Sequence, residues 1–164
     1  TILKGLHRLL DTWEKYFIHN ESIELLVVGS VDSSVSTVVS NYHKIKNCKF
    51  LGSVDNPTKR LFFERADIIV IPSLIDASPV TLIEAFGYGK PVLVSDGVGN
   101  SWLVQHRVNG YLYSVENTQG IKEGINFYID NFQNISEMGI NAKQKLFEIK
   151  ELRTIYKVME LLLH

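Results

Sequence analysis

The apolar residues of this chain recur at two different spacings. Residues 3–18 carry apolar side chains about one helical turn apart, which is typical of a helix with one buried face. These side chains are Leu6, Leu9, Leu10, Trp13 and Phe17. Other stretches, such as ELLVVG at residues 24–29, are continuously apolar and predict strands that are buried on both faces.

Along the whole chain the two patterns alternate. The expected strands cover residues 24–29, 48–52, 67–71, 91–95 and 110–113. The expected helices cover residues 3–18, 34–44, 56–65, 78–87 and 101–106, with a helical region from 118 that is broken near 131–134 and again near Lys150. Asn56 reads as the N-cap of its helix, with Pro57 at the first helical position.

This order of strands and helices predicts an α/β fold with three layers and a mostly parallel sheet. Residues 1–164 are expected to form a single domain, with 150–164 as its terminal helix. A domain of this type normally opens on a strand, whereas this chain opens on a helix. We therefore expect the first strand to lie upstream, in a larger protein.

Composition limits the classes of function. The 164 residues are 45% hydrophobic and 21% charged, which is an ordinary balance for one globular domain. The net charge of −1 gives no reason to expect a nucleic-acid partner. Cys48 is the only cysteine, so an internal disulfide is excluded. No apolar run approaches the length of a membrane span.

The segment from Ile69 to Gly97 combines a short apolar strand, a loop that contains Asp76 and a helix that contains Glu84. The carboxyl end of a strand that leads into a helix N-terminus is where α/β proteins hold phosphates. Asp76 lies at that edge and could bind sugar hydroxyls. The alternative is a turn aspartate that caps its own loop.

The expected helix start has Ser78 as the N-cap and Pro79 at the first helical position. The amides of Val80 and Thr81 would then be unpaired donors at a positive helix end, where they could hold a diphosphate. The alternative is that the Ser78 hydroxyl satisfies one amide and water satisfies the rest.

Helical spacing sorts the side chains of this helix into two stripes. The apolar stripe contains Leu82, Ile83 and Phe86, and the other stripe contains Thr81, Glu84 and Tyr88. Glu84 is therefore directed away from the core and could accept hydrogen bonds from a ribose diol. The alternative is a solvated glutamate that the helix dipole favours.

Over residues 4–130 the chain resembles the C-terminal half of a group 1 (family 4) glycosyltransferase, which has a Rossmann-like α/β/α fold within the GT-B architecture. The matching stretches occur in the family's order with its approximate spacing. They are Lys4-Gly5, LLVVGS at 25–30, FLGSV at 50–54, RADIIVIPS at 65–73, the segment from Asp76 to Glu84, EAFGYGKPVLVSDGVGN at 84–100 and VNGYLY at 108–113.

The resemblance implies a site for a nucleoside-diphosphate sugar, UDP- or GDP-linked, which is a substrate rather than a cofactor. Glu84 would hold the ribose hydroxyls, Asp76 the sugar hydroxyls, and Lys4 the diphosphate. The catalytic set would be Lys4, Asp76 and Glu84. Gly29 and Ser30 would lie near the donor, and the Gly52-Ser53-Val54 loop would flank the base. The full donor-binding set would be Gly29, Ser30, Gly52, Ser53, Val54, Ser78, Pro79, Val80, Thr81 and Glu84.

The implied reaction is retaining transfer of a glycosyl group to a sugar or lipid-linked glycan acceptor, held by an N-terminal half, in polysaccharide or glycoconjugate synthesis. A lysine and a helix dipole can stabilise the departing phosphate without a metal ion. The sequence also has no Asp-x-Asp, the motif of the metal-dependent alternative, so no metal is expected. The implied location is cytoplasmic, with peripheral association at the inner membrane face as an option for the full-length protein.

Two positions depart from the family. Its first acid is usually glutamate, whereas this chain has Asp76. Its arginine before the lysine would fall upstream of Thr1. We expect this chain alone to bind a nucleotide weakly and to transfer no sugar. Two other readings stay open: a nucleotide-sugar epimerase of the same architecture, or a non-catalytic binding domain.

Overall fold

The computed structural model describes residues 2–30, 42 and 45–162, with residues 150–162 described by their backbone alone. The helix expected at 34–44 lies, apart from Tyr42, outside the described residues.

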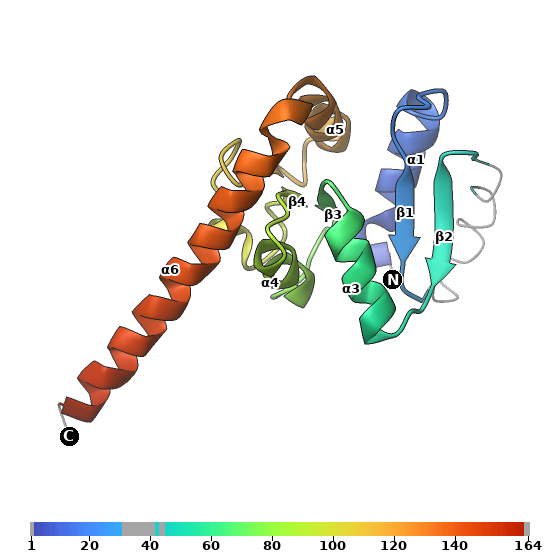
Figure 1. Ribbon diagram of the computed structural model, residues 1–164. Coiled ribbons are helices and arrows are strands. Elements are labelled where there is room, and N and C mark those ends of the chain that lie inside the picture. The colour runs from blue at the N-terminus through green and yellow to red at the C-terminus, as the bar shows by residue number, and fades with distance from the viewer. Residues whose placement is uncertain (1, 31–41, 43–44, 163–164) are drawn as a thin grey trace.

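The strands and helices of the described chain follow one another in the predicted order (Figure 1). The strands are β1 (Leu25–Val28), β2 (Cys48–Gly52), β3 (Ile69–Ile71), β4 (Val92–Ser95) and β5 (Gly110–Tyr113). The helices are α1 (Leu6–Tyr16), α3 (Asn56–Arg65), α4 (Val80–Gly87), α5 (Gly120–Asp130) and α6 (Ile135–Leu162). Short 3₁₀ turns cover Ile2–Lys4, Ser101–Leu103 and Phe132–Asn134. The expected strands are therefore confirmed, with limits that differ by up to two residues.

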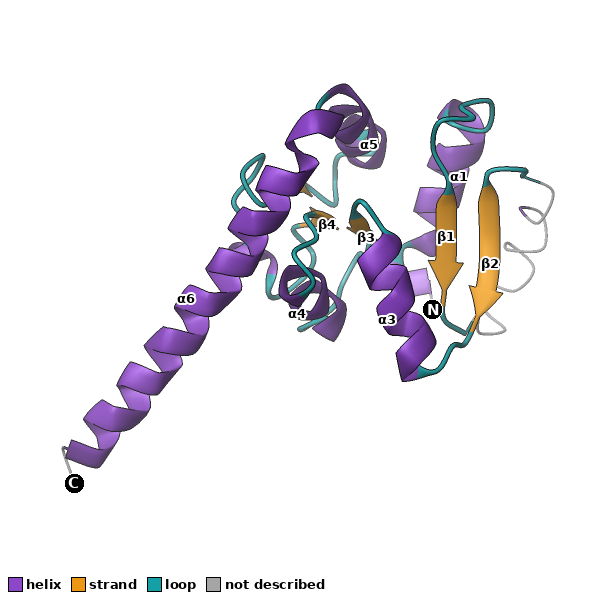
Figure 2. Ribbon diagram, in the orientation of Figure 1, coloured by secondary structure: helices purple, strands orange, loops and turns teal. Residues whose placement is uncertain are grey.

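The strand pairs are all parallel, which confirms the predicted type of sheet. They form two separate sheets, β1-β2 and β3-β4-β5, and not one continuous sheet (Figure 2). In the first, Leu25 lies opposite Cys48. In the second, Val92 lies between Ile69 and Gly110. Within the described residues, β1, β2, β3 and β5 thus each have one edge that no strand covers.

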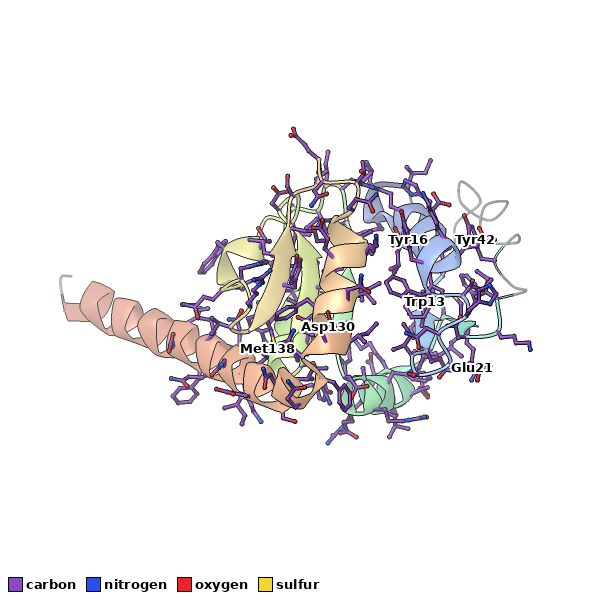
Figure 3. All side chains as sticks on the ribbon, turned by 90° about the horizontal axis from the view of Figure 1, so that it is seen from above. Trp13, Tyr16, Glu21, Tyr42, Asp130 and Met138 are labelled. Carbon is purple, nitrogen blue, oxygen red and sulfur yellow. The ribbon has the colours of Figure 1, made fainter. Side chains whose placement is uncertain are left out.

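β4 shows the three layers most clearly, because all four of its residues are buried. Leu93 packs into a core that includes residues of α1 and α5, whereas Val92 and Val94 pack into a second core with α4 and α6. Alternate residues of a strand point to opposite faces of its sheet, so helices cover both faces. Figure 3 shows α5 between α1, which carries Trp13, and the start of α6, which carries Met138. The predicted α/β/α architecture is confirmed.

The start of α3 differs from the prediction by one residue. The N-cap is Asp55, whose carboxylate accepts a hydrogen bond from the Thr58 amide at 2.9 Å, and Asn56 is already helical. Hydrogen bonding with Thr58 lowers the pKa of the Asp55 carboxyl below its ordinary value. Aspartate and asparagine cap helices equally well, and here the residue that reaches the third helical amide is Asp55.

The predicted break near Lys150 is wrong, because α6 continues from Ile135 to Leu162. The sequence around Lys150 contains no glycine or proline, and its leucine, glutamate, lysine and arginine residues all favour a helix. The terminal helix therefore begins at Ile135 and not at residue 150. Neither α6 nor any other helix of the described chain is long and apolar enough to cross a membrane.

Candidate functional site

The loop that follows β3 is joined backbone to backbone to the loop that follows β4. The Asp76 amide donates to the Gly97 carbonyl at 3.1 Å, and the Gly99 amide donates to the Asp76 carbonyl at 2.7 Å. Gly99 has no room for a side chain, because a Cβ would overlap the Ala77 carbonyl oxygen. These contacts fix the backbone of Asp76 at the carboxyl edge of the sheet, where the sequence predicts it.

Asn100 connects the same loop to the start of α4. It is 7% exposed, and its side-chain amide donates to the Pro79 carbonyl at 3.2 Å. Asn100 precedes the 3₁₀ turn at Ser101–Leu103, but its side chain makes no capping hydrogen bond to that turn. Its role is therefore to hold α4 in place, which the sequence did not predict.

We expect Asn100→Ala to lower the free energy of unfolding by about 1–2 kcal/mol, because a buried hydrogen bond is lost and a small space opens beside Pro79. Urea unfolding measures this difference. Asn134→Ala is the control, because Asn134 is exposed and its side chain makes no hydrogen bond recorded within the described chain. Equal effects of the two substitutions would contradict the assigned role.

The start of α4 also differs by one residue from the prediction. Pro79 is the N-cap, with φ −65° and ψ 121°, and no side chain caps the helix. The positive ψ keeps Pro79 extended, so Val80 becomes the first helical residue and Ser78 lies outside the cap. Within the described residues, no acceptor is recorded for the amides of Val80 and Thr81. The alternative in which the Ser78 hydroxyl satisfies one of them is therefore wrong.

The buried face of α4 is formed by Leu82, Ala85 and Phe86, each 0% exposed. Leu82 and Phe86 were predicted there, but Ile83 is 36% exposed and does not belong to this face. Successive residues of a helix are about 100° apart, so Ile83 points away from the direction of Leu82. The apolar character of Ile83 alone led to the wrong assignment.

Glu84 lies on the other side of α4, as predicted, but it is not simply solvated. Its Oε1 is 2.6 Å from Nζ of Lys59 on α3, and its side chain is 28% exposed. The part played by Lys59 could not be predicted from the sequence, because nothing in the chain signals which residue of one helix faces a given residue of another.

Lys4 and Asp76, 72 residues apart in sequence, form an ion pair. The turn before α1 lies against the loop after β3: the Leu74 amide donates to the Leu3 carbonyl at 2.8 Å. Gly5 has φ +68°, and a Cβ there would overlap the Pro72 carbonyl oxygen. Lys4 is 57% and Asp76 13% exposed in their side chains. The structure thus brings together two of the predicted catalytic residues.

The glycines at the ends of β1 and β2 are also neighbours. The Gly29 amide donates to the Gly52 carbonyl at 2.8 Å, and a Cβ on either glycine would meet nothing within 4 Å. Ser30 and Ser53 beside them are exposed, and Val54 is half-buried. Within the described residues, no recorded hydrogen bond or ion pair joins this group to Lys4, Asp76 or Glu84.

The surroundings of two other titratable groups, His106 and Cys48, shift their pKa values. The Nδ1 of His106 accepts a hydrogen bond from the Leu112 amide at 3.2 Å, and burial lowers the pKa of this imidazole below its ordinary value. Burial also raises the pKa of the Cys48 thiol to about 11. The described chain contains no group of three or more side chains suited to hold a metal ion; metal independence stays a prediction.

A family model described as glycosyl transferases group 1 matches residues 1–145. The chain belongs to this family. The resemblance noted in the sequence is therefore confirmed, and its extent is somewhat larger than the predicted 4–130.

Several curated relatives of this glycosyltransferase chain match most of it. An uncharacterised glycosyltransferase of Methanocaldococcus jannaschii is 27% identical over 96% of the chain and 43% of its own length. The O-antigen chain mannosyltransferase C of Escherichia coli is 24% identical over 89% of the chain and 39% of its own length. The chain thus spans less than half the length of these two relatives.

Solved glycosyltransferases share the fold. The UDP complex of HepE from Anabaena superposes with a TM-score of 0.78 at 22% identity, covering 98% of this chain and 46% of HepE. The C-terminal domain of the group 1 protein LpcC from Francisella tularensis gives 0.80 at 15% identity, covering 90% of this chain and 80% of that one. The fold is that of the Rossmann-like C-terminal half of a GT-B glycosyltransferase.

Proposed function

We propose that this chain is the donor-binding half of a glycosyltransferase that takes a glycosyl group from a nucleoside-diphosphate sugar. The observation that carries the proposal is the arrangement at the end of β3. Asp76 lies in the loop between β3 and α4, and Lys4 forms an ion pair with it. The same loop leads into the uncapped start of α4. Glu84 follows one turn later in the same helix.

In this proposal Lys4 and the amides of Val80 and Thr81 bind the diphosphate. Breaking the glycosidic bond gives the sugar an oxocarbenium-like character and leaves negative charge on the departing phosphate. A cation and unpaired amides at a positive helix end stabilise that charge as it develops. This set of donors needs no metal ion. Asp76, beside Lys4, contacts the hydroxyls of the sugar that is transferred.

The nucleoside would lie beyond α4. Glu84 accepts hydrogen bonds from the ribose hydroxyls, and the Gly52-Ser53-Val54 loop flanks the base. Gly29 and Ser30 lie beside that loop, and the open space at Gly29 leaves room for the donor. Ser78 and Pro79 shape the turn into α4. The UDP complex of HepE, a protein of the same fold, supports a nucleotide as the ligand.

The complete reaction belongs to a longer protein in this proposal. The upstream half would hold the acceptor, a sugar or a lipid-linked glycan, and the transfer would retain the anomeric configuration. Biosynthesis of a polysaccharide or glycoconjugate is supported by the O-antigen and diphosphoundecaprenol substrates in the names of two relatives from Escherichia coli. The isolated 164 residues would bind nucleotide weakly and transfer no sugar. The longer protein would act in the cytoplasm.

Calorimetric titration of the full-length protein with UDP and with GDP tests the proposal. We expect one of them to bind, and Glu84→Ala to weaken that binding about 10- to 100-fold, because two hydrogen bonds to a charged acceptor are lost. Glu64→Ala is the control, because Glu64 pairs with the exposed Arg60 on α3. If neither nucleotide binds, or if Glu84→Ala behaves like the control, the proposal is refuted.

A further inference from the structure

Helices α3 and α4 lie side by side (Figure 1) and meet through two pairs of side chains. Lys59 of α3 forms the ion pair with Glu84 of α4 at 2.6 Å. One turn further along, the ring of Phe63 in α3 stacks on the ring of Tyr88, the C-cap of α4, with centroids 5.1 Å apart and planes 12° apart. The ring stack fixes the relative placement of the two helices, so Lys59 meets Glu84 in a defined geometry.

The ion pair leaves most of the Glu84 carboxylate available. A carboxylate offers about four acceptor positions on its two oxygens, and within the described residues Lys59 is the one recorded partner, at Oε1. The side chains of Lys59 and Glu84 are 40% and 28% exposed, so a ligand can reach them.

Lys59 also lies close to the loop that ends β2. Asp55 caps α3 directly after the Gly52–Val54 segment, and Lys59 follows one turn later, with its amide bonded to the Asp55 carbonyl at 2.9 Å. Its side chain therefore links the start of α3 to the acid of α4. Lys59 therefore joins the two parts of the molecule that the proposed nucleoside would contact, which are the loop after β2 and Glu84 of α4.

We propose that Lys59 is a positioning residue for ribose recognition, which holds the Glu84 carboxylate in the orientation that accepts both hydroxyls of a ribose diol. This inference rests on the proposed function. A glutamate side chain that is already ordered loses less conformational entropy when the ligand arrives. Lys59 acts through Glu84 and touches none of the reacting atoms, so it affects donor binding rather than the chemical step.

The test compares UDP and GDP with their 2′,3′-dideoxy analogues, using calorimetry on the full-length protein. For the nucleotide that binds, we expect Lys59→Met to raise Kd about fivefold. The dideoxy analogue should bind Lys59→Met and the unchanged protein equally well, so the preference for ribose falls by the same factor. Lys59→Arg should restore the preference. In turnover assays KM for the donor should rise and kcat should stay unchanged.

Lys90→Met is the matched control, because Lys90, three residues after the end of α4, also contacts α3, through a hydrogen bond from its Nζ to the Glu64 carbonyl at 2.9 Å. It should leave the ribose preference unchanged. If Lys59→Met keeps the preference while Glu84→Ala abolishes it, the inference is overturned and the proposed function stands. If Glu84→Ala also keeps the preference, or if neither nucleotide binds, both are overturned.

Discussion

Replacing Gly5 with alanine should lower the free energy of unfolding by about 2–5 kcal/mol. Two effects add at this position. The backbone has φ +68°, a left-handed conformation that is unfavourable for alanine by about 1–2 kcal/mol. The new methyl group would also overlap the Pro72 carbonyl oxygen, and forced overpacking costs about 1–3 kcal/mol. Urea unfolding of Gly5→Ala measures the sum.

Gly52→Ala separates the two effects. Gly52 has almost the same backbone angle, φ +65°, but a Cβ there would meet nothing within 4 Å. We expect this control to lose only about 1–2 kcal/mol. The difference between the two variants then reports the contact between Gly5 and Pro72. Equal losses would mean that this contact relaxes without strain, and that Lys4 is not held rigidly beside Asp76.

The second large effect is expected from Lys4→Met in the full-length enzyme. We expect kcat to fall about 10²- to 10³-fold, because one preorganised donor to a developing anion contributes about that much. The Kd of the nucleotide should change less, since the charge on the phosphate increases as the glycosidic bond breaks. Steady-state kinetics with saturating donor, combined with calorimetry, separates the two quantities.

Lys49→Met is the control for the loss of a positive charge. Lys49 also forms an ion pair, with Glu24, but both side chains are exposed, and neither belongs to the proposed site. Its kcat should equal that of the unchanged enzyme. An unchanged kcat in Lys4→Met as well would remove Lys4 from the catalytic set and leave the uncapped start of α4 as the remaining donor to the phosphate.

Much of the fold could be predicted, because strand and helix periods differ and each strand of this chain is a short apolar run. That Lys4 and Asp76 belong to one site was implied only by the family, and their ion pair was not predicted, since no local pattern connects residues so far apart. Asp55 and Asn56 are both suited to an N-cap, so the sequence could not distinguish them. The apolar Ile83 likewise concealed the true face of α4.

Contacts between separate helices were the least predictable part. The ion pair of Lys59 with Glu84 depends on how α3 and α4 lie against each other, and the ring stack of Phe63 and Tyr88 contributes to that placement. No spacing within either helix specifies the partner in the other. The division into two sheets was missed for the same reason, because strand order is a property of the assembled layers.

The uncovered strand edges have a consequence for how this chain associates. Within the described residues, each of β1, β2, β3 and β5 has one side whose backbone amides and carbonyls no strand binds. Such edges hydrogen-bond to any extended segment that reaches them. They are therefore the places where the chain can add a strand from elsewhere in a longer polypeptide, or exchange strands with a second copy and begin to aggregate.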